Sequence, residues 1–131
     1  MLKAVLFDMD GVIVDTEPLH HKAYLKMFSE VGIEVSTQMY EGFTGQSTYS
    51  ICVQLCTYFK LHHKAEELVQ IKRSHFTKLF FDDHDLQLIE GVEQLIKEYY
   101  DNNLILVLAS SASMFTINNV MKRFNLDRFF S

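Results

Sequence analysis

The chain has 131 residues, of which 48% are hydrophobic and 22% are charged, which is an ordinary composition for one folded domain. Its formal net charge of −5 offers no broad basic surface, so binding a nucleic-acid backbone is disfavoured as its main task. No apolar stretch is long enough to cross a bilayer, and the first residues do not resemble a secretory signal, so we expect a cytoplasmic protein without a membrane segment.

An apolar strand is predicted near the start of the chain, and it leads directly into two carboxylates. Residues 4–7 read Ala-Val-Leu-Phe, and Asp8 and Asp10 follow them, two positions apart. Carboxylates at the end of a buried strand are costly unless a cation, a metal or a hydrogen-bond donor compensates them, so the pair predicts a metal site. The alternative is a tight β-hairpin, because Asp10-Gly11 stands between two apolar runs. The two interpretations are compatible, since such a hairpin could act as a flap over the site.

The middle of the chain is predicted to be a helical insertion over residues 17–80. Asp15 or Thr16 is expected to cap its first helix, with Pro18 in the first turn. Residues 42–47 read as a loop that caps a second long helix, and apolar residues continue at helical spacing to the end of the insertion.

The second half of the chain alternates helix, strand and helix. Residues 104–109 form a continuous apolar run, which is typical of a strand covered on both faces in a parallel sheet. A helical pattern precedes this run, and a second one follows it to about residue 124. The order predicts an α/β fold, with residues 1–16 and 81–131 forming a core that is interrupted by a helical cap over residues 17–80.

Two sequence motifs point to a family. Residues 3–21 read KAVLFDMDGVIVDTEPLHH, and residues 108–111 read Leu-Ala-Ser-Ser. Together they resemble the haloacid dehalogenase superfamily, in particular its capped branch of β-phosphoglucomutase-like enzymes and sugar-phosphate phosphatases. The resemblance covers essentially the whole chain and implies a Rossmann-like core with a partial parallel sheet and an inserted α-helical cap.

The resemblance also implies a reaction, namely Mg²⁺-dependent hydrolysis of a small phosphorylated metabolite through an aspartyl-phosphate intermediate. Asp8 would be the nucleophile and Asp10 the general acid and base, and both would hold Mg²⁺. Ser110 and Ser111 would bind the phosphate. The alternative for these two serines is a plain helix cap.

Substrate choice in the capped relatives lies in the cap, and the resemblance implies roles there for His20, Gly45 and Lys72. The alternatives are a surface position for His20 in the first helical turn and a solvated helix face for Lys72. Mutase-like relatives carry an arginine near position 48, where this chain has Thr48, and this departure favours a phosphatase.

The family's core also needs a later lysine and one or two further acids, and residue 131 comes before either of them. We therefore expect this chain to be a fragment of a longer one. Two other hypotheses stay open, a sugar-phosphate mutase and a non-catalytic relative that binds phosphate or a partner. A homo-oligomer or a domain swap could complete the core if the chain is this short.

Overall fold

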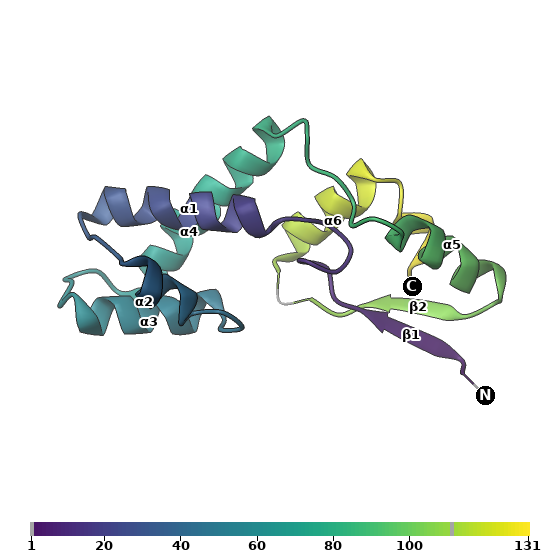
Figure 1. The fold of residues 1–131 in the computed structure, drawn as a ribbon, viewed down its shortest axis with the longest axis horizontal. Coiled ribbons are helices and arrows are strands. Elements are labelled where there is room, and N and C mark those ends of the chain that lie inside the picture. Colours follow the sequence, from purple (N-terminus) through teal and green to yellow (C-terminus); the bar gives the residue numbers. More distant parts are fainter. Residues whose placement is uncertain (1, 111) are drawn as a thin grey trace. The chain divides into compact units, whose positions relative to one another are not determined.

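The structure, a computed structural model, describes residues 2–110 and 112–131 (Figure 1). The elements in chain order are β1 (Ala4–Phe7), α1 (Glu17–Val31), α2 (Thr37–Glu41), α3 (Thr48–Tyr58), α4 (Ala65–Asp82), α5 (Val92–Asp101), β2 (Ile105–Leu108), α6 (Met114–Arg123) and the 3₁₀ helix η1 (Asp127–Phe129). They form two compact units. The sheet unit comprises the chain up to Glu17 together with His84–Ser131, and the helical unit is Pro18–Asp83.

The sheet unit is built on a parallel pair of strands, as the sequence predicted. β1 and β2 pair with Val5 opposite Leu106 and Phe7 opposite Leu108. Helix α5 packs against β2, and the two strands lie side by side in Figure 1. On the other edge of β2, Phe130 forms a parallel bridge with Leu106. Apolar side chains in an extended chain favour such a sheet because their alternating faces can be buried together.

One face of this sheet differs from the prediction. Phe7 and Leu106, on the face that packs inward, are 6% and 1% exposed. Leu6 and Ile105 lie on the opposite face and are 71% and 53% exposed. The prediction that the second strand is covered on both faces is therefore wrong for the residues described, because within them only one face is packed.

The segment after β1 forms a tight turn, and the β-hairpin alternative is wrong. The Met9 carbonyl accepts hydrogen bonds from the N–H groups of Val12, Ile13 and Val14, at 3.3, 2.9 and 3.2 Å. Val14 then forms an antiparallel bridge with Leu88 and none with β1. Ile13 and Val14 are fully buried. Tertiary burial of these two side chains therefore overrides the local hairpin signal.

The helical unit has a core of its own, formed by apolar side chains at helical spacing. α1, α3 and α4 each turn a buried stripe inward, and α3 packs against α4. The core cluster consists of Tyr24, Met27, Phe28, Phe43, Ile51, Cys52, Leu55, Leu68 and Val69. Within the described residues, no helix of either unit is long and apolar enough to span a membrane.

The buried thiol of Cys52 makes the free energy of unfolding depend on pH. Burial, with Cys56 as a second cause, raises the pKa of the Cys52 thiol from 9.0 to about 11. Because the folded state then holds this proton more tightly than the unfolded state, the free energy of unfolding should fall as pH rises from 9 to 11. We expect a loss on the order of 2 kcal/mol in urea unfolding across this window, and a smaller loss for Cys52→Ala. If the free energy of unfolding fell equally with pH in the original chain and in Cys52→Ala, the raised pKa of Cys52 would be contradicted as its cause.

Candidate active site

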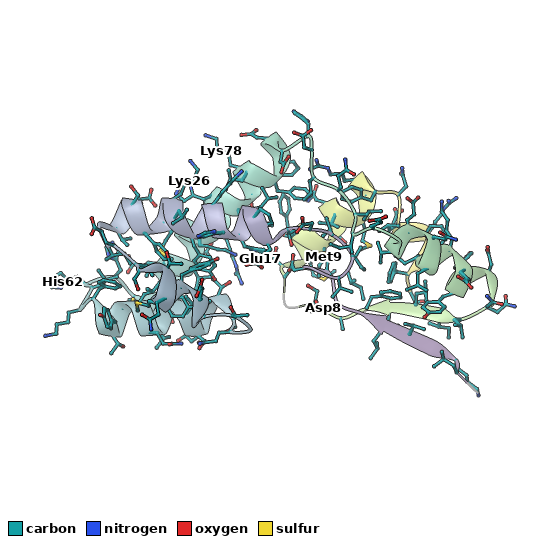
Figure 2. The ribbon with its side chains drawn as sticks, in the orientation of Figure 1. Asp8, Met9, Glu17, Lys26, His62 and Lys78 are labelled. Atoms are coloured by element: carbon teal, nitrogen blue, oxygen red, sulfur yellow. The ribbon has the colours of Figure 1, made fainter. Side chains whose placement is uncertain are left out.

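Asp8 leaves the sheet at the carboxyl end of β1, where Figure 2 shows it beside Met9. Its side chain is exposed, whereas Met9 is fully buried. The Met9 N–H donates a 2.7 Å hydrogen bond to Asp8 Oδ1. Because the Met9 side chain is buried and the Met9 carbonyl accepts three hydrogen bonds in the turn, this N–H is a fixed donor that orients the Asp8 carboxylate.

Asp10 is held by a residue for which the sequence suggested a different role. Thr16 is fully buried, and its hydroxyl donates a 2.5 Å hydrogen bond to Asp10 Oδ1. The sequence predicts Asp15 or Thr16 as the cap of the first helix, but the Thr16 hydroxyl donates to a carboxylate six residues earlier. The sequence carried no signal for this pair, because the contact depends on the path of the turn between the two residues.

This hydrogen bond supports a prediction about stability. Thr16→Val keeps the shape of the side chain but removes the donor, which leaves a half-buried carboxylate oxygen without this bond. We expect the free energy of unfolding to fall by roughly 1.5–3 kcal/mol in urea titrations, the range for a hydrogen bond to a charged group. Thr16→Ser keeps the hydroxyl and serves as the control. A Thr16→Val variant as stable as Thr16→Ser would contradict the importance of this bond.

Ser110 lies at the same edge of the sheet as Asp8. Phe7 and Leu108 are opposite each other, and the Ala109 N–H donates a 2.7 Å hydrogen bond to the Phe7 carbonyl, so both loops begin side by side. The Ser110 hydroxyl oxygen accepts from the Ala112 N–H at 3.1 Å. Its own proton can therefore be donated to a ligand.

The helix that follows is capped by another serine. The hydroxyl of Ser113 accepts from the Thr116 N–H at 3.2 Å, at the N-terminus of α6. The helix-cap alternative for Ser110 is therefore wrong, because Ser113 occupies the cap position. Ser111 lies outside the described residues.

Two of the predicted cap residues meet inside the helical unit. Lys72 on α4 is 4% exposed, and its Nζ lies 2.7 Å from Nδ1 of His20 on α1. A charged Lys72 can only donate, so this bond then requires His20 Nδ1 as its acceptor. The His20 ring stacks on Phe76, with 4.3 Å between the ring centroids. The solvated-face alternative for Lys72 is wrong, since its ammonium is buried beside aromatic rings.

Gly45, the third predicted cap residue, lies in the loop before α3. Its φ is +82°, a backbone conformation that glycine adopts without strain, and no atom of another residue would contact an added Cβ. The structure thus places Asp8, Asp10 and Ser110 in the sheet unit and His20, Gly45 and Lys72 in the helical unit.

The oxygen donors of the sheet unit fit a hard cation. Among the described residues, no three or more His, Cys, Asp or Glu side chains gather as a metal site. Mg²⁺, however, often takes only one or two protein carboxylates and completes its shell with water and substrate phosphate. Asp8 and Asp10 supply two carboxylates at one strand end, so this donor set is compatible with Mg²⁺.

Comparison with known sequences places the chain in a family of hydrolases. A 6-phosphogluconate phosphatase from Escherichia coli is 31% identical over 96 residues, which cover 72% of this chain and 42% of the relative. A phosphorylated carbohydrates phosphatase from Thermotoga maritima is 26% identical over 98% of this chain and 59% of its own length. The chain therefore spans about half the length of these two relatives.

Solved structures share the fold. A haloacid dehalogenase hydrolase from Entamoeba histolytica superposes with a TM-score of 0.83 at 18% identity, over 99% of this chain and 58% of that one. A β-phosphoglucomutase from Clostridium difficile gives a TM-score of 0.82 at 24% identity, over 100% of this chain and 60% of that one. These likenesses confirm the predicted α/β fold class. Since the sequence profile of haloacid dehalogenase-like hydrolases also matches residues 5–131, the chain belongs to that family.

Proposed function

We propose that the protein is a Mg²⁺-dependent phosphomonoester hydrolase that acts on a small phosphorylated metabolite through an aspartyl-phosphate on Asp8. One observation carries the proposal. Asp8, Asp10 and Ser110 follow paired parallel strands at one edge of the sheet, in a chain of this family. Ligands of open α/β sheets bind at the carboxyl ends of the strands. The phosphatase names of the two sequence relatives support the same reaction class.

In the first step, an Asp8 carboxylate oxygen attacks phosphorus, and the bond between phosphorus and the ester oxygen breaks. The leaving oxygen takes a proton from the Asp10 carboxyl group. Because the Thr16 hydroxyl donates to Asp10 Oδ1, the transferable proton belongs on Oδ2. The Met9 N–H keeps Asp8 oriented throughout this step.

In the second step, water attacks the phosphorus of the aspartyl-phosphate, and the bond to Asp8 breaks. Asp10, now ionised, accepts the proton of this water, so both carboxyl groups return to their starting states. The Ser110 hydroxyl donates to a phosphoryl oxygen, which stabilises the charge that develops there. The products are the dephosphorylated alcohol and inorganic phosphate.

Mg²⁺, held by the carboxylate of Asp8 and by the backbone carbonyl of Asp10, would offset the negative charge between Asp8 and the phosphoryl group. In the same proposal the sheet unit is the catalytic core and the helical unit is the cap. His20, Gly45 and Lys72, all in the helical unit, would then influence which substrate is accepted. The hydrogen bond between Lys72 and His20 supports this part, since it places a buried cation and its histidine partner in one unit.

A sugar-phosphate mutase is the second candidate, because a β-phosphoglucomutase from Bacillus subtilis is 27% identical over 85% of this chain. Thr48 weighs against it. The Thr48 hydroxyl oxygen lies 3.2 Å from the Tyr24 hydroxyl, which donates to it, and threonine brings no positive charge for a second phosphate.

The test is phosphate release from a panel of sugar phosphates and nucleoside monophosphates, with and without Mg²⁺. We expect release that stops when EDTA removes Mg²⁺ and returns when Mg²⁺ is restored, but not when Na⁺ is added. An isomerised sugar phosphate without net phosphate release would favour the mutase. Release that ignores EDTA would overturn the hydrolase proposal. No turnover of any substrate would leave Asp8 and Asp10 as an incomplete site in this chain and would favour the non-catalytic alternative.

A further inference from the structure

Tyr24 on α1 lies at a junction with the other three helices of the helical unit, and its side chain is buried. Its hydroxyl donates a 3.2 Å hydrogen bond to Thr48 Oγ1, at the first residue of α3. Its ring packs edge-on against Tyr40 of α2, with 5.8 Å between the ring centroids. Lys72 Nζ, from α4, lies 4.9 Å from the centroid of the Tyr24 ring. One buried side chain therefore contacts α2, α3 and α4.

Two of these contacts lie on either side of the loop that carries Gly45. Residues 42–47 connect α2 to α3, so Tyr40 precedes this loop and Thr48 follows it. The aromatic contact with Tyr40 and the hydrogen bond to Thr48 thus tie both ends of the loop to the same side chain on α1. Removing the Tyr24 hydroxyl would release the Thr48 end and keep the aromatic contact.

The third contact helps to hold Lys72, whose side chain comes to rest between two helices. Its Nζ lies 2.7 Å from His20 Nδ1, one helical turn before Tyr24 on α1. It also lies 5.2 Å from the centroid of the Phe76 ring, one turn later on α4. Aromatic faces attract an ammonium group at such distances. A lysine head on a flexible four-carbon stem needs several such contacts to keep one position, and the Tyr24 ring supplies one of them.

We propose that Tyr24 is a positioning residue, whose ring fixes the Lys72 ammonium and whose hydroxyl fixes the loop of Gly45. The two groups then keep one geometry relative to each other. A preorganised pair binds its matching substrate more tightly, because less freedom is lost on binding. The proposal rests on the proposed function, since it assumes that Lys72 and Gly45 influence which substrate is accepted. Tyr24 acts through them and takes no part in the steps at Asp8.

NMR of a chain labelled with ¹³C and ¹⁵N tests the positioning without requiring turnover. Tyr24→Phe keeps the ring and removes the hydroxyl, so we expect the Gly45 amide signal to shift and the Lys72 ε-methylene signals to stay. Tyr24→Leu also removes the ring current, so the Lys72 signals should move too. The control is Tyr58→Phe, at a tyrosine that is 68% exposed, and it should move neither. A Gly45 amide signal that ignores Tyr24→Phe would overturn the inference, even if Tyr24→Leu does not fold.

A double-mutant cycle tests the consequence for substrate selection. The measured quantity is the ratio of kcat/KM for glucose 6-phosphate to kcat/KM for p-nitrophenyl phosphate, which offers no sugar hydroxyl groups. We expect Tyr24→Phe to lower this ratio roughly two- to tenfold, the fold-change that one neutral hydrogen bond is worth. Thr48→Val should lower it equally. The double variant should lose no more than either single variant, because all three remove the same bond.

The outcomes separate this inference from the proposed function. A Tyr24→Phe variant that unfolds at lower urea concentration but keeps the original ratio would give Tyr24 a structural role alone and would overturn the inference. Losses that add in the double variant would contradict a joint action of the two hydroxyl groups. Absence of phosphate release from the original chain would count against the proposed function, whereas the NMR signals would still decide whether Tyr24 positions Lys72 and the loop of Gly45.

Discussion

Asp8→Asn is expected to reduce phosphate release from glucose 6-phosphate by at least about 10⁴-fold, which is the scale of removing a covalent nucleophile. The carboxamide has the size of the carboxylate, but it is a poor nucleophile and carries no charge for Mg²⁺. Asp8 is exposed, and the Met9 N–H can still donate to the amide oxygen, so the fold should be unaffected. The measurement is initial phosphate release at saturating Mg²⁺.

The control for Asp8→Asn is urea unfolding, where we expect a change within about 0.5 kcal/mol, as for exposed substitutions in general. A loss of activity smaller than tenfold in a variant that unfolds like the original chain would contradict the role of Asp8 as nucleophile. A large loss of both stability and activity would instead assign Asp8 a structural role.

Asp10→Asn is expected to reduce release from glucose 6-phosphate by about 10²–10⁴-fold, the contribution of a general acid and base. The Thr16 hydroxyl can still donate to the new amide oxygen, so the turn should persist. The loss should depend on the leaving group. p-Nitrophenolate leaves without a proton, so the first step survives with p-nitrophenyl phosphate, whereas the second step still lacks its base.

The variant should therefore release a burst of p-nitrophenol, about one equivalent per protein, and then slow down. Stopped-flow absorbance measures the burst, and the original chain, with both steps intact, is the reference. Equal losses for both substrates without a burst would contradict the assignment of Asp10 as acid in the first step and base in the second.

Local patterns predicted the elements well because helical spacing and apolar runs report what each segment can bury. The predicted first helix corresponds to α1, and the apolar run at residues 104–109 contains β2. The same run could not show that Ile105 is 53% exposed, because a sequence gives the apolar character of a strand and does not show what covers it. Asp10-Gly11 likewise favoured a hairpin, whereas Val14 pairs with a segment more than 70 residues later.

The candidate site was predictable where it depends on neighbours in sequence. Asp8 and Asp10 follow a recognisable strand, and their position at its carboxyl end needed no tertiary information. The contact between His20 and Lys72 joins residues 52 positions apart, so spacing could not predict it. The bond from Thr16 to Asp10 spans only six positions, but it depends on a turn that buries Ile13 and Val14.

Chemical trapping of the intermediate tests the central claim most directly. The protein is mixed with glucose 6-phosphate and Mg²⁺, quenched within milliseconds in acid, and treated with borohydride, which reduces an aspartyl-phosphate to homoserine. Tandem mass spectrometry then locates the change in the chain. We predict homoserine at Asp8 in the original chain and none in the Asp8→Asn variant. With p-nitrophenyl phosphate as substrate, Asp10→Asn should give more homoserine than the original chain, because only its second step is blocked. Phosphate release without any modification of Asp8, or modification of another carboxylate, would contradict the proposed mechanism.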